Sequence, residues 1–122
     1  MDGSESQARL FKTLMHPARL AILEILRPGE ACVCHMEAAL GYRQAYISQQ
    51  LMVLREAGLV GDRRDGWNIY YRVAKPEIFK VMDSARAALG RTRKTGERFV
   101  AKSCNCPNCT HEVARESRLI QT

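Results

Sequence analysis

The change of hydrophobic period near Gly58 constrains the fold of this chain more than any other feature. Across residues 44–57 the apolar side chains recur at helical spacing, and Gly58 is well suited to end a helix. A first strand is predicted to begin at residue 59, and residues 69–73 read as a returning strand. Residues 63–66 between them include an Asp-Gly pair, which is typical of a tight hairpin turn. The chain is therefore predicted to place a helix directly before a β-hairpin.

Four further helices are predicted around this unit. They cover residues 7–14, the stretch from Pro17 to the Pro28-Gly29 pair, about residues 35–40 up to Gly41, and a last segment opened by Pro76. The helix that begins at Pro17 is nearly all apolar on its inner side and is predicted to be the core helix. Residues 1–6 are expected to fray and residues 30–34 to form a linker. The order helix, tight turn, helix and hairpin predicts a mainly α fold with a small β-hairpin, the winged helix-turn-helix. In that fold the second helix of the pair enters the major groove of DNA.

Polar side chains at the N-terminal end of the predicted 44–57 helix are candidates for base contacts. They are Gln44, Tyr46, Ser48 and Gln49. Gln can form two hydrogen bonds with adenine, and Ser can bond either bases or phosphates. Arg63 and Arg64, at the expected tip of the hairpin, suit phosphates or the minor groove. Taken singly, Tyr46 and Trp67 are better explained by surface packing than by DNA contacts. The two arginines, taken singly, are better explained as part of a solvated turn. The order of the elements shifts the balance to DNA.

The charge of the chain agrees with a nucleic-acid partner. The net charge is +6 and the pI is about 9.3, which favours an anionic partner. No apolar run approaches the roughly 20 residues that span a bilayer, and residues 1–5 lack the features of a signal peptide. We therefore expect a cytoplasmic protein without a membrane partner. No set of nucleophile, base and acid and no phosphate loop is present, so neither an enzyme nor a small organic substrate is expected.

The five cysteines fall into two tight groups, which is not the distribution of core packing. They are Cys32 and Cys34 near the start, and Cys104, Cys106 and Cys109 near the end. Thiolates are soft ligands that select Zn, Cd, Pb and Cu(I). Successive helical residues turn by roughly 100°, so Cys32 and Cys34 converge only if their segment is extended or if Cys32 precedes the helix. A lone CxC pair is more often coincidental than ligating, whereas CxCxxC in a polar tail favours ligation.

The helix-turn-helix stretches resemble the ArsR/SmtB family of bacterial metal-sensing repressors. The resemblance is carried by residues 14–23, 47–60 and 66–71, and it extends over residues 8–90. The Cys32-Val33-Cys34 segment, preceded by Glu30-Ala31, is similar to the thiolate motif of the family's arsenic and cadmium sensors.

Three features depart from the family pattern. Glu37 stands where the arsenic-type motif often has a third cysteine. Gln49-Gln50 replaces the usual histidine-rich pair, and Trp67 takes a hairpin position that is often Arg. The last two departures bear on which operator sequence is bound.

The resemblance implies a homodimeric repressor of double-stranded operator DNA that is released by a thiophilic ion. As(III), Cd and Pb are the expected inducers, and Zn is a further candidate. Cys32 and Cys34 would be completed by tail cysteines from either subunit, by His35 or by water. Cys32 and Cys34 with one tail sulfur would suit As(III) or Pb. The same pair with two tail sulfurs would suit Zn, Cd or Pb. A thiol redox sensor on the same fold, in which Cys32 or Cys34 bonds a tail cysteine, is the alternative.

Three further expectations concern the rest of the chain. Residues 1–94 are expected to form the DNA-binding and dimerisation domain, and residues 95–122 a cysteine-containing tail. The last helix carries an apolar stripe that a monomer cannot cover, which supports a dimer; its members are Ile78, Met82, Ala85 and Leu89. His35 is expected to cap a helix, and no zinc site is expected on the last helix because Glu77 and Asp83 have no histidine near them.

Overall fold

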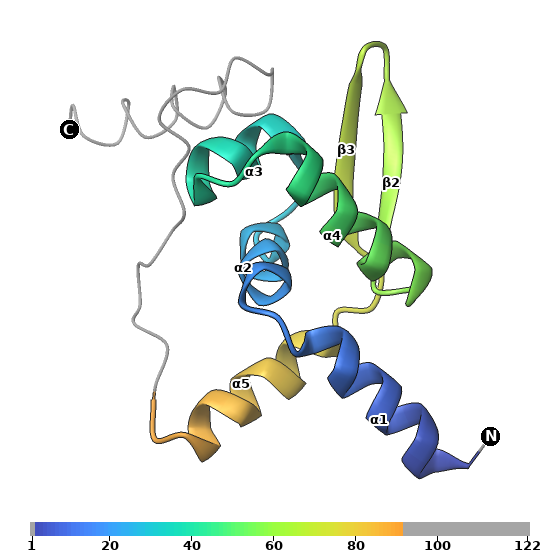
Figure 1. The fold of residues 1–122 in the computed structure, drawn as a ribbon, viewed down its shortest axis with the longest axis vertical. Helices are drawn as coiled ribbons and strands as arrows, with labels where there is room; N and C mark the ends of the chain where they lie inside the picture. The colour runs from blue at the N-terminus through green and yellow to red at the C-terminus, as the bar shows by residue number, and fades with distance from the viewer. Residues whose placement is uncertain (1, 92–122) are drawn as a thin grey trace.

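The computed structural model of the chain describes residues 2–91 (Figure 1). This part of the chain contains five helices and a three-stranded antiparallel sheet. The elements are α1 Gly3–Leu14, α2 Pro17–Leu26, β1 Ala31–Cys32, α3 Val33–Leu40, α4 Gln44–Glu56, β2 Val60–Asp65, β3 Asn68–Val73 and α5 Ile78–Ala88. Helix α3, the turn, α4 and the β2–β3 hairpin follow in the predicted order of a winged helix-turn-helix. The predicted boundary at residue 94 lies outside the described residues.

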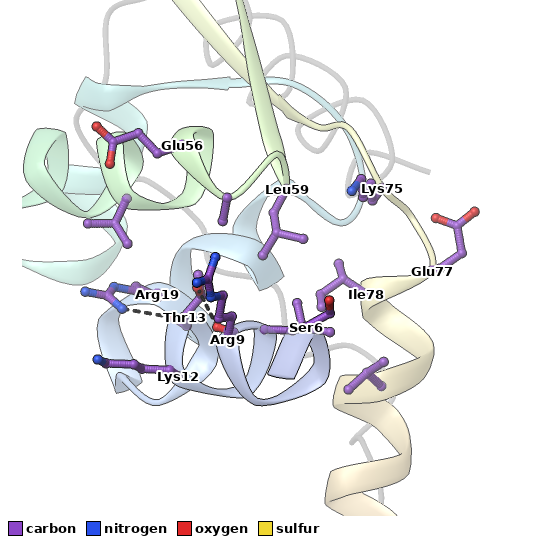
Figure 2. Close-up of a pocket in the computed structure, with 14 residues that line it drawn as sticks. Ser6, Arg9, Lys12, Thr13, Arg19, Glu56, Leu59, Lys75, Glu77 and Ile78 are labelled. Carbon is purple, nitrogen blue, oxygen red and sulfur yellow. Dashed lines mark hydrogen bonds between the residues drawn. The ribbon is translucent and has the colours of Figure 1, made fainter. Parts of the chain in front are cut away.

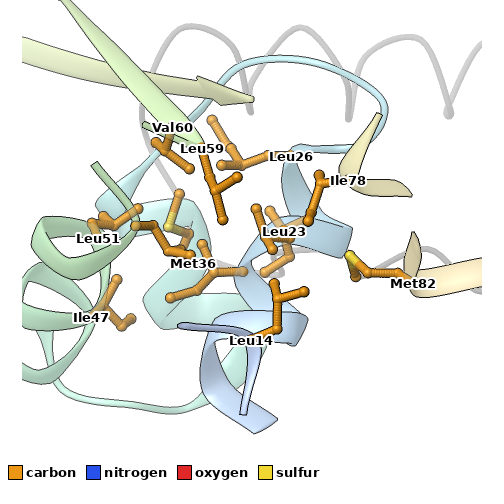
Figure 3. Close-up of a cluster of buried hydrophobic side chains, with 14 residues drawn as sticks. Leu14, Leu23, Leu26, Met36, Ile47, Leu51, Leu59, Val60, Ile78 and Met82 are labelled. Atoms are coloured by element: carbon orange, nitrogen blue, oxygen red, sulfur yellow. The ribbon is translucent and has the colours of Figure 1, made fainter. Parts of the chain in front are cut away.

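Helix α2 is the centre of the core, as the sequence predicts. Ile22 and Leu23 are completely buried, and they meet Met36 of α3 and Leu51 and Leu54 of α4. Figure 3 shows Leu23, Met36, Leu51 and Val60 converging from α2, α3, α4 and the base of the hairpin, in that order. Removing a large aliphatic side chain from water contributes about 1.5–3 kcal/mol, so this cluster is what holds α3 and α4 in place.

Helix α1 is longer than the sequence pattern indicates. The expected helix over residues 7–14 begins instead at Gly3, so the expectation that residues 1–6 fray is wrong for residues 3–6. Asp2 is the N-cap, and its carboxylate accepts a hydrogen bond from the backbone N–H of Glu5 at 3.0 Å. The cap satisfies one of the free N–H groups of the first turn, and the acidic Glu5 favours the same end of the helix dipole.

The segment predicted to be a linker, residues 30–34, contains an additional strand of the sheet, β1. Ala31 and Cys32 form β1, which pairs with β3 through Ala31–Tyr71 and Cys32–Tyr70. The strand order is β1-β3-β2, so β3 is central. Helix α3 then begins at Val33, two residues before the expected start. Two residues are too few for an alternating pattern, which is why the sequence gives no strand signal here.

The hairpin turn lies closer to Trp67 than predicted. Strands β2 and β3 pair over six residues each, and the last pair is Asp65–Asn68. The loop therefore consists of Gly66 and Trp67 alone, with Gly66 in the left-handed region at φ 61°. Two-residue loops with glycine in this region match the twist of the flanking strands. The predicted turn over residues 63–66 is wrong, because Arg63 and Arg64 lie within β2.

A cluster of charged side chains fastens α5 to α2. Arg27 forms paired hydrogen bonds with Glu24 at 2.8 and 2.9 Å and with Asp83 at 2.9 and 3.1 Å. The Arg27 guanidinium also lies 4.4 Å from the centre of the Phe79 ring, and Arg86 reaches Glu24 at 3.6 Å. Hydrogen bonding with Glu24, opposed by burial and aided by Asp83, raises the pKa of Arg27. The two carboxylates therefore hold the Arg27 guanidinium between α2 and α5.

The apolar stripe of α5 is covered only in its first half. Ile78 and Met82 are buried in the core of the same chain, which corrects the expectation that the whole stripe needs a partner. Ala85 and Leu89 are exposed, and 74% of Leu89 is accessible. Helices α1 and α5 lie at the end of the molecule away from the hairpin tip (Figure 1). Phe11 on α1 is also half exposed, so this end retains apolar surface.

Candidate functional site

Helix α4 divides its side chains between an outward face and the core. The four residues that the sequence marks for base contacts, Gln44, Tyr46, Ser48 and Gln49, are all exposed. Between them Ile47 is completely buried and fixes the helix against the core. The Tyr46 ring lies 5.1 Å from the Tyr42 ring with a tilt of 59°, so it also packs on the turn that precedes α4. Gly41 ends α3 in the left-handed region at φ 74° and makes this tight turn possible.

Gln50 has a different role from its neighbour Gln49. The Gln50 side chain is buried, and its Oε1 accepts a hydrogen bond from Nε of Arg19 at 2.8 Å. Arg19 also donates from Nη1 to the backbone carbonyl of Thr13 at 3.1 Å. This bridge joins α4 to α2 and to the end of α1. No local motif indicates this bridge, because Arg19 and Gln50 are separated by 31 positions along the chain.

Arg63 and Arg64 differ in what they contact. Arg63 Nε forms an ion pair with Glu30 Oε2 at 2.7 Å, and its guanidinium lies 4.8 Å from the centre of the Tyr70 ring. Arg63 is thus engaged within the chain rather than held free at the hairpin tip. Arg64 is exposed, and within residues 2–91 it takes part in no ion pair. Trp67 at the end of the hairpin is fully exposed. Glu30 and Tyr70 were not predicted as site residues, since no local spacing links them to Arg63.

The two early thiols converge at the junction of β1 and α3. Cys32 is the last residue of β1 and the N-cap of α3, with extended backbone angles of φ −93° and ψ 167°. Cys34 is the second residue of the helix and is exposed, whereas Cys32 is 5% accessible. Their Sγ atoms lie 2.7 Å apart. The sequence predicts that the two sulfurs converge if Cys32 precedes the helix, and Cys32 does precede it.

The described residues supply two sulfurs and no complete metal shell. Among residues 2–91, no group of three or more Cys, His, Asp or Glu side chains gathers at one point. The predicted ligands Cys104, Cys106 and Cys109 lie outside the described residues. His35 is the third residue of α3 and is buried, so the expectation that it caps the helix is wrong. At the last helix, the carboxylate of Asp83 is bound by Arg27.

A separate cavity of about 780 Å³ lies between α1, the end of α4 and the start of α5 (Figure 2). Its walls combine apolar residues with the cationic side chains of Arg9, Lys12, Arg19 and Lys75. No cysteine or histidine lines it, so it offers no alternative site for a soft ion.

Comparison with known proteins places this arrangement in a family. Residues 16–61 match the family described as bacterial regulatory protein, arsR family. The chain is 46% identical over 80 residues to the biofilm growth-associated repressor of Agrobacterium fabrum, a match that covers 66% of this chain and 68% of that relative. The chain belongs to the ArsR family. This ArsR-family chain is a transcriptional repressor of the ArsR/SmtB type and not an enzyme.

Two further relatives bear on fold and effector. The arsenic resistance transcriptional regulator ArsR1 of Pseudomonas putida is 46% identical over 67 residues, covering 55% of this chain and 51% of that protein. The homodimeric winged helix-turn-helix DNA-binding domain Mb0332 from Mycobacterium bovis is 31% identical, with a TM-score of 0.63, covering 70% of this chain and 80% of that one. The predicted fold class is thereby confirmed. Within residues 2–91, no helix is both long and apolar enough to cross a membrane.

Proposed function

We propose that this repressor binds double-stranded operator DNA as a homodimer and leaves it when a thiophilic ion binds cysteine thiolates at the start of α3. As(III), Cd(II) and Pb(II) are the proposed inducers, with Zn(II) as a fourth candidate. The observation that carries the proposal is the 2.7 Å approach of the Cys32 and Cys34 sulfurs at the entry to α3. Helix α3 packs on α4, so a ligand at this point acts directly on the helix that faces outward.

The proposed DNA contacts fall into two classes. Gln44, Ser48 and Gln49 project from the start of α4 and would read base edges in the major groove. Tyr46 borders them. Arg64, and Arg63 through the guanidinium nitrogens that do not bind Glu30, would neutralise phosphates, which position the protein without specifying sequence. In a homodimer the two α4 helices would address half-sites related by the same two-fold axis.

The proposed ion site is completed from the tail. Soft ions need three or four sulfurs, and Cys32 with Cys34 supplies two. Cys104, Cys106 and Cys109 are proposed to supply the others, from the same subunit or from its partner. Their number suits either a three-sulfur shell for As(III) or Pb(II) or a four-sulfur shell for Zn(II) or Cd(II). The likeness to a relative named for arsenic resistance favours As(III) among these ions.

The coupling between ion and DNA follows from the position of the thiols. Ligation would fix the junction of β1 and α3 in a geometry set by the ion, and α3 would transmit the shift to α4. Because coupling between two ligands is reciprocal, operator DNA must weaken ion binding by the same factor by which the ion weakens DNA binding.

The test uses reduced full-length protein under anaerobic conditions. A labelled duplex from the protein's own promoter is bound, and arsenite or CdCl₂ is titrated while fluorescence anisotropy reports DNA release. Cys32→Ser and Cys34→Ser should bind DNA normally and lose the response. Joint replacement of Cys104, Cys106 and Cys109 by Ser should lower ion affinity or change which ion is preferred. Full response in the Cys32→Ser protein would refute the proposed site.

A thiol redox switch on the same fold is the second candidate, and the exposure of the Cys34 thiol, which lets an oxidant reach it, favours it. Here Cys32 or Cys34 and a tail cysteine would each give up a proton, and together two electrons, to a peroxide, forming a disulfide and two waters. Hydrogen peroxide would then release DNA without any metal, and dithiothreitol would restore binding. Release by arsenite or Cd(II) under strict anaerobiosis separates the two candidates.

A further inference from the structure

We infer that the Arg63–Glu30 ion pair, called the latch below, couples ion binding at Cys32 and Cys34 to the position of the β2–β3 hairpin. The inference rests on the proposed function and adds a second route to it. The α3–α4 contact would act on the outward helix, and the latch would act on the hairpin. Arg63 and Glu30 are positioning residues in this scheme and need not touch DNA or the ion.

The pairing of the three strands places one residue of the thiol segment and two residues of the hairpin side by side, in a row across the sheet. Cys32 of β1 is paired with Tyr70 of β3, and Tyr70 is paired with Arg63 of β2. Residues directly opposite one another in antiparallel strands project from the same face of the sheet. Cys32, Tyr70 and Arg63 therefore share one face, in that order. Arg64, the next residue of β2, projects from the opposite face.

Two short contacts hold Arg63 in this row, and a longer ion pair joins its Nη1 to Asp65 Oδ2 at 3.9 Å. Its Nε lies 2.7 Å from Glu30 Oε2, a short charge-assisted bond, and its guanidinium sits 4.8 Å above the Tyr70 ring. Tyr70 is 2% accessible, so the ring is a fixed platform. Glu30 belongs to the segment that enters β1, two positions before Cys32. The latch consequently ties the hairpin to the segment that carries the thiols.

Strand β1 is the element that would move. It has only two residues, paired with β3 at Ala31 and Cys32, and Cys32 is also the N-cap of α3. An ion that sets the positions of both sulfurs reorients Cys32 and displaces the short strand with it. Glu30 moves with the strand, the Arg63–Glu30 bond is lost, and the hairpin changes its position relative to α4. The hairpin then contributes less to DNA binding.

The decisive experiment compares DNA release in latch variants of the full-length dimer. Operator affinity is measured with and without saturating arsenite or Cd(II), whichever releases the wild type, and ion affinity is measured separately from sulfur-to-metal absorbance or competition. Glu30→Gln and Arg63→Gln should bind the ion at least as tightly as the wild type does, because the ion no longer has to break this bond. The ratio of the two DNA affinities should fall by about fivefold. Energetic couplings between sites in proteins commonly amount to a factor of 5–150, so a loss of this size is measurable.

Matched controls separate coupling from simple loss of charge. Lys12→Gln removes one positive charge from α1, away from the hairpin, so it should lower both DNA affinities equally and leave the ratio unchanged. The exchange of Glu30→Arg with Arg63→Glu in one protein restores an ion pair of reversed polarity. That double variant should recover most of the wild-type ratio, which a merely structural role for either side chain would not produce.

A readout without DNA follows from the composition of the hairpin. Trp67 is the only tryptophan of the chain and lies at the end of the hairpin. Its fluorescence anisotropy should fall in ion-free Glu30→Gln and Arg63→Gln, and the ion should lower it in the wild type but not further in these variants. An unchanged release ratio in Glu30→Gln, or equal anisotropy in all forms, would overturn the latch. A wild type that no ion releases would instead refute the proposed function, and the latch with it.

Discussion

Replacing Arg27 by Ala should cost about 3 kcal/mol of unfolding free energy. Glu24, whose side chain is 7% accessible, would lose two hydrogen bonds and keep only Arg86 at 3.6 Å. Removing one member of a buried ion pair costs about 3–5 kcal/mol, and the remaining arginine offsets part of this. The lost contact with Asp83 adds little, because that carboxylate is half exposed and well solvated. Loss of the stacking on Phe79 adds about 0.5–1 kcal/mol.

Urea unfolding followed by circular dichroism at one fixed protein concentration measures this loss. The fixed concentration matters because a dimer's apparent stability depends on it. Arg55→Ala is the matched control: Arg55 pairs with Asp62 at 3.5 Å, and both side chains are more than one third exposed. It should cost no more than about 0.5 kcal/mol. A loss below about 1 kcal/mol for Arg27→Ala would show that this cluster is not what fastens α5 to α2.

Four further outcomes follow from the structure. Leu54→Ala should cost about 2–5 kcal/mol in the same urea assay, because Leu54 is completely buried between α4 and the core; a smaller loss would mean that the site collapses around the change. Gly41→Ala should cost about 1 kcal/mol, since φ is 74° and nothing lies within 4 Å, so backbone strain alone acts; no loss would contradict a fixed turn. Arg64→Ala should reduce the slope of log affinity against log salt by about one for all DNA sequences, whereas Gln49→Ala should relax preference at one base pair at a cost of about 1–3 kcal/mol; equal effects on operator and random duplexes would remove Gln49 from base reading.

The sequence predicted those parts of the fold that repeat along a helix or a strand. Helix α4 was expected over residues 44–57 and ends at Glu56, and the central position of α2 followed from its apolar residues. Strand β1 was missed because two residues carry no period. The start of α1 was missed because the cap at Asp2 depends on a local hydrogen bond rather than on apolar spacing.

The candidate site was predictable in its residue types and not in its connections. The spacing of Cys32 and Cys34 defined when their sulfurs would meet, and the structure meets that condition. The ion pair of Arg63 with Glu30 joins positions 33 apart. Such partners are set by strand register and tertiary packing, so composition and local motifs contain no record of them.

Gln49 faces outward and Gln50 binds Arg19, and this difference has a consequence for how the repressor can evolve. The outward glutamine lies free of the core, whereas its neighbour braces α4 against Arg19. Given the base contact proposed for Gln49, substitutions at the outward position would redirect the protein to a new operator without loosening the scaffold. Substitutions at the inward position would tilt the whole helix and alter every proposed base contact together. Drift in target sequence should accordingly proceed through one face of α4, while the other face is kept by selection for folding.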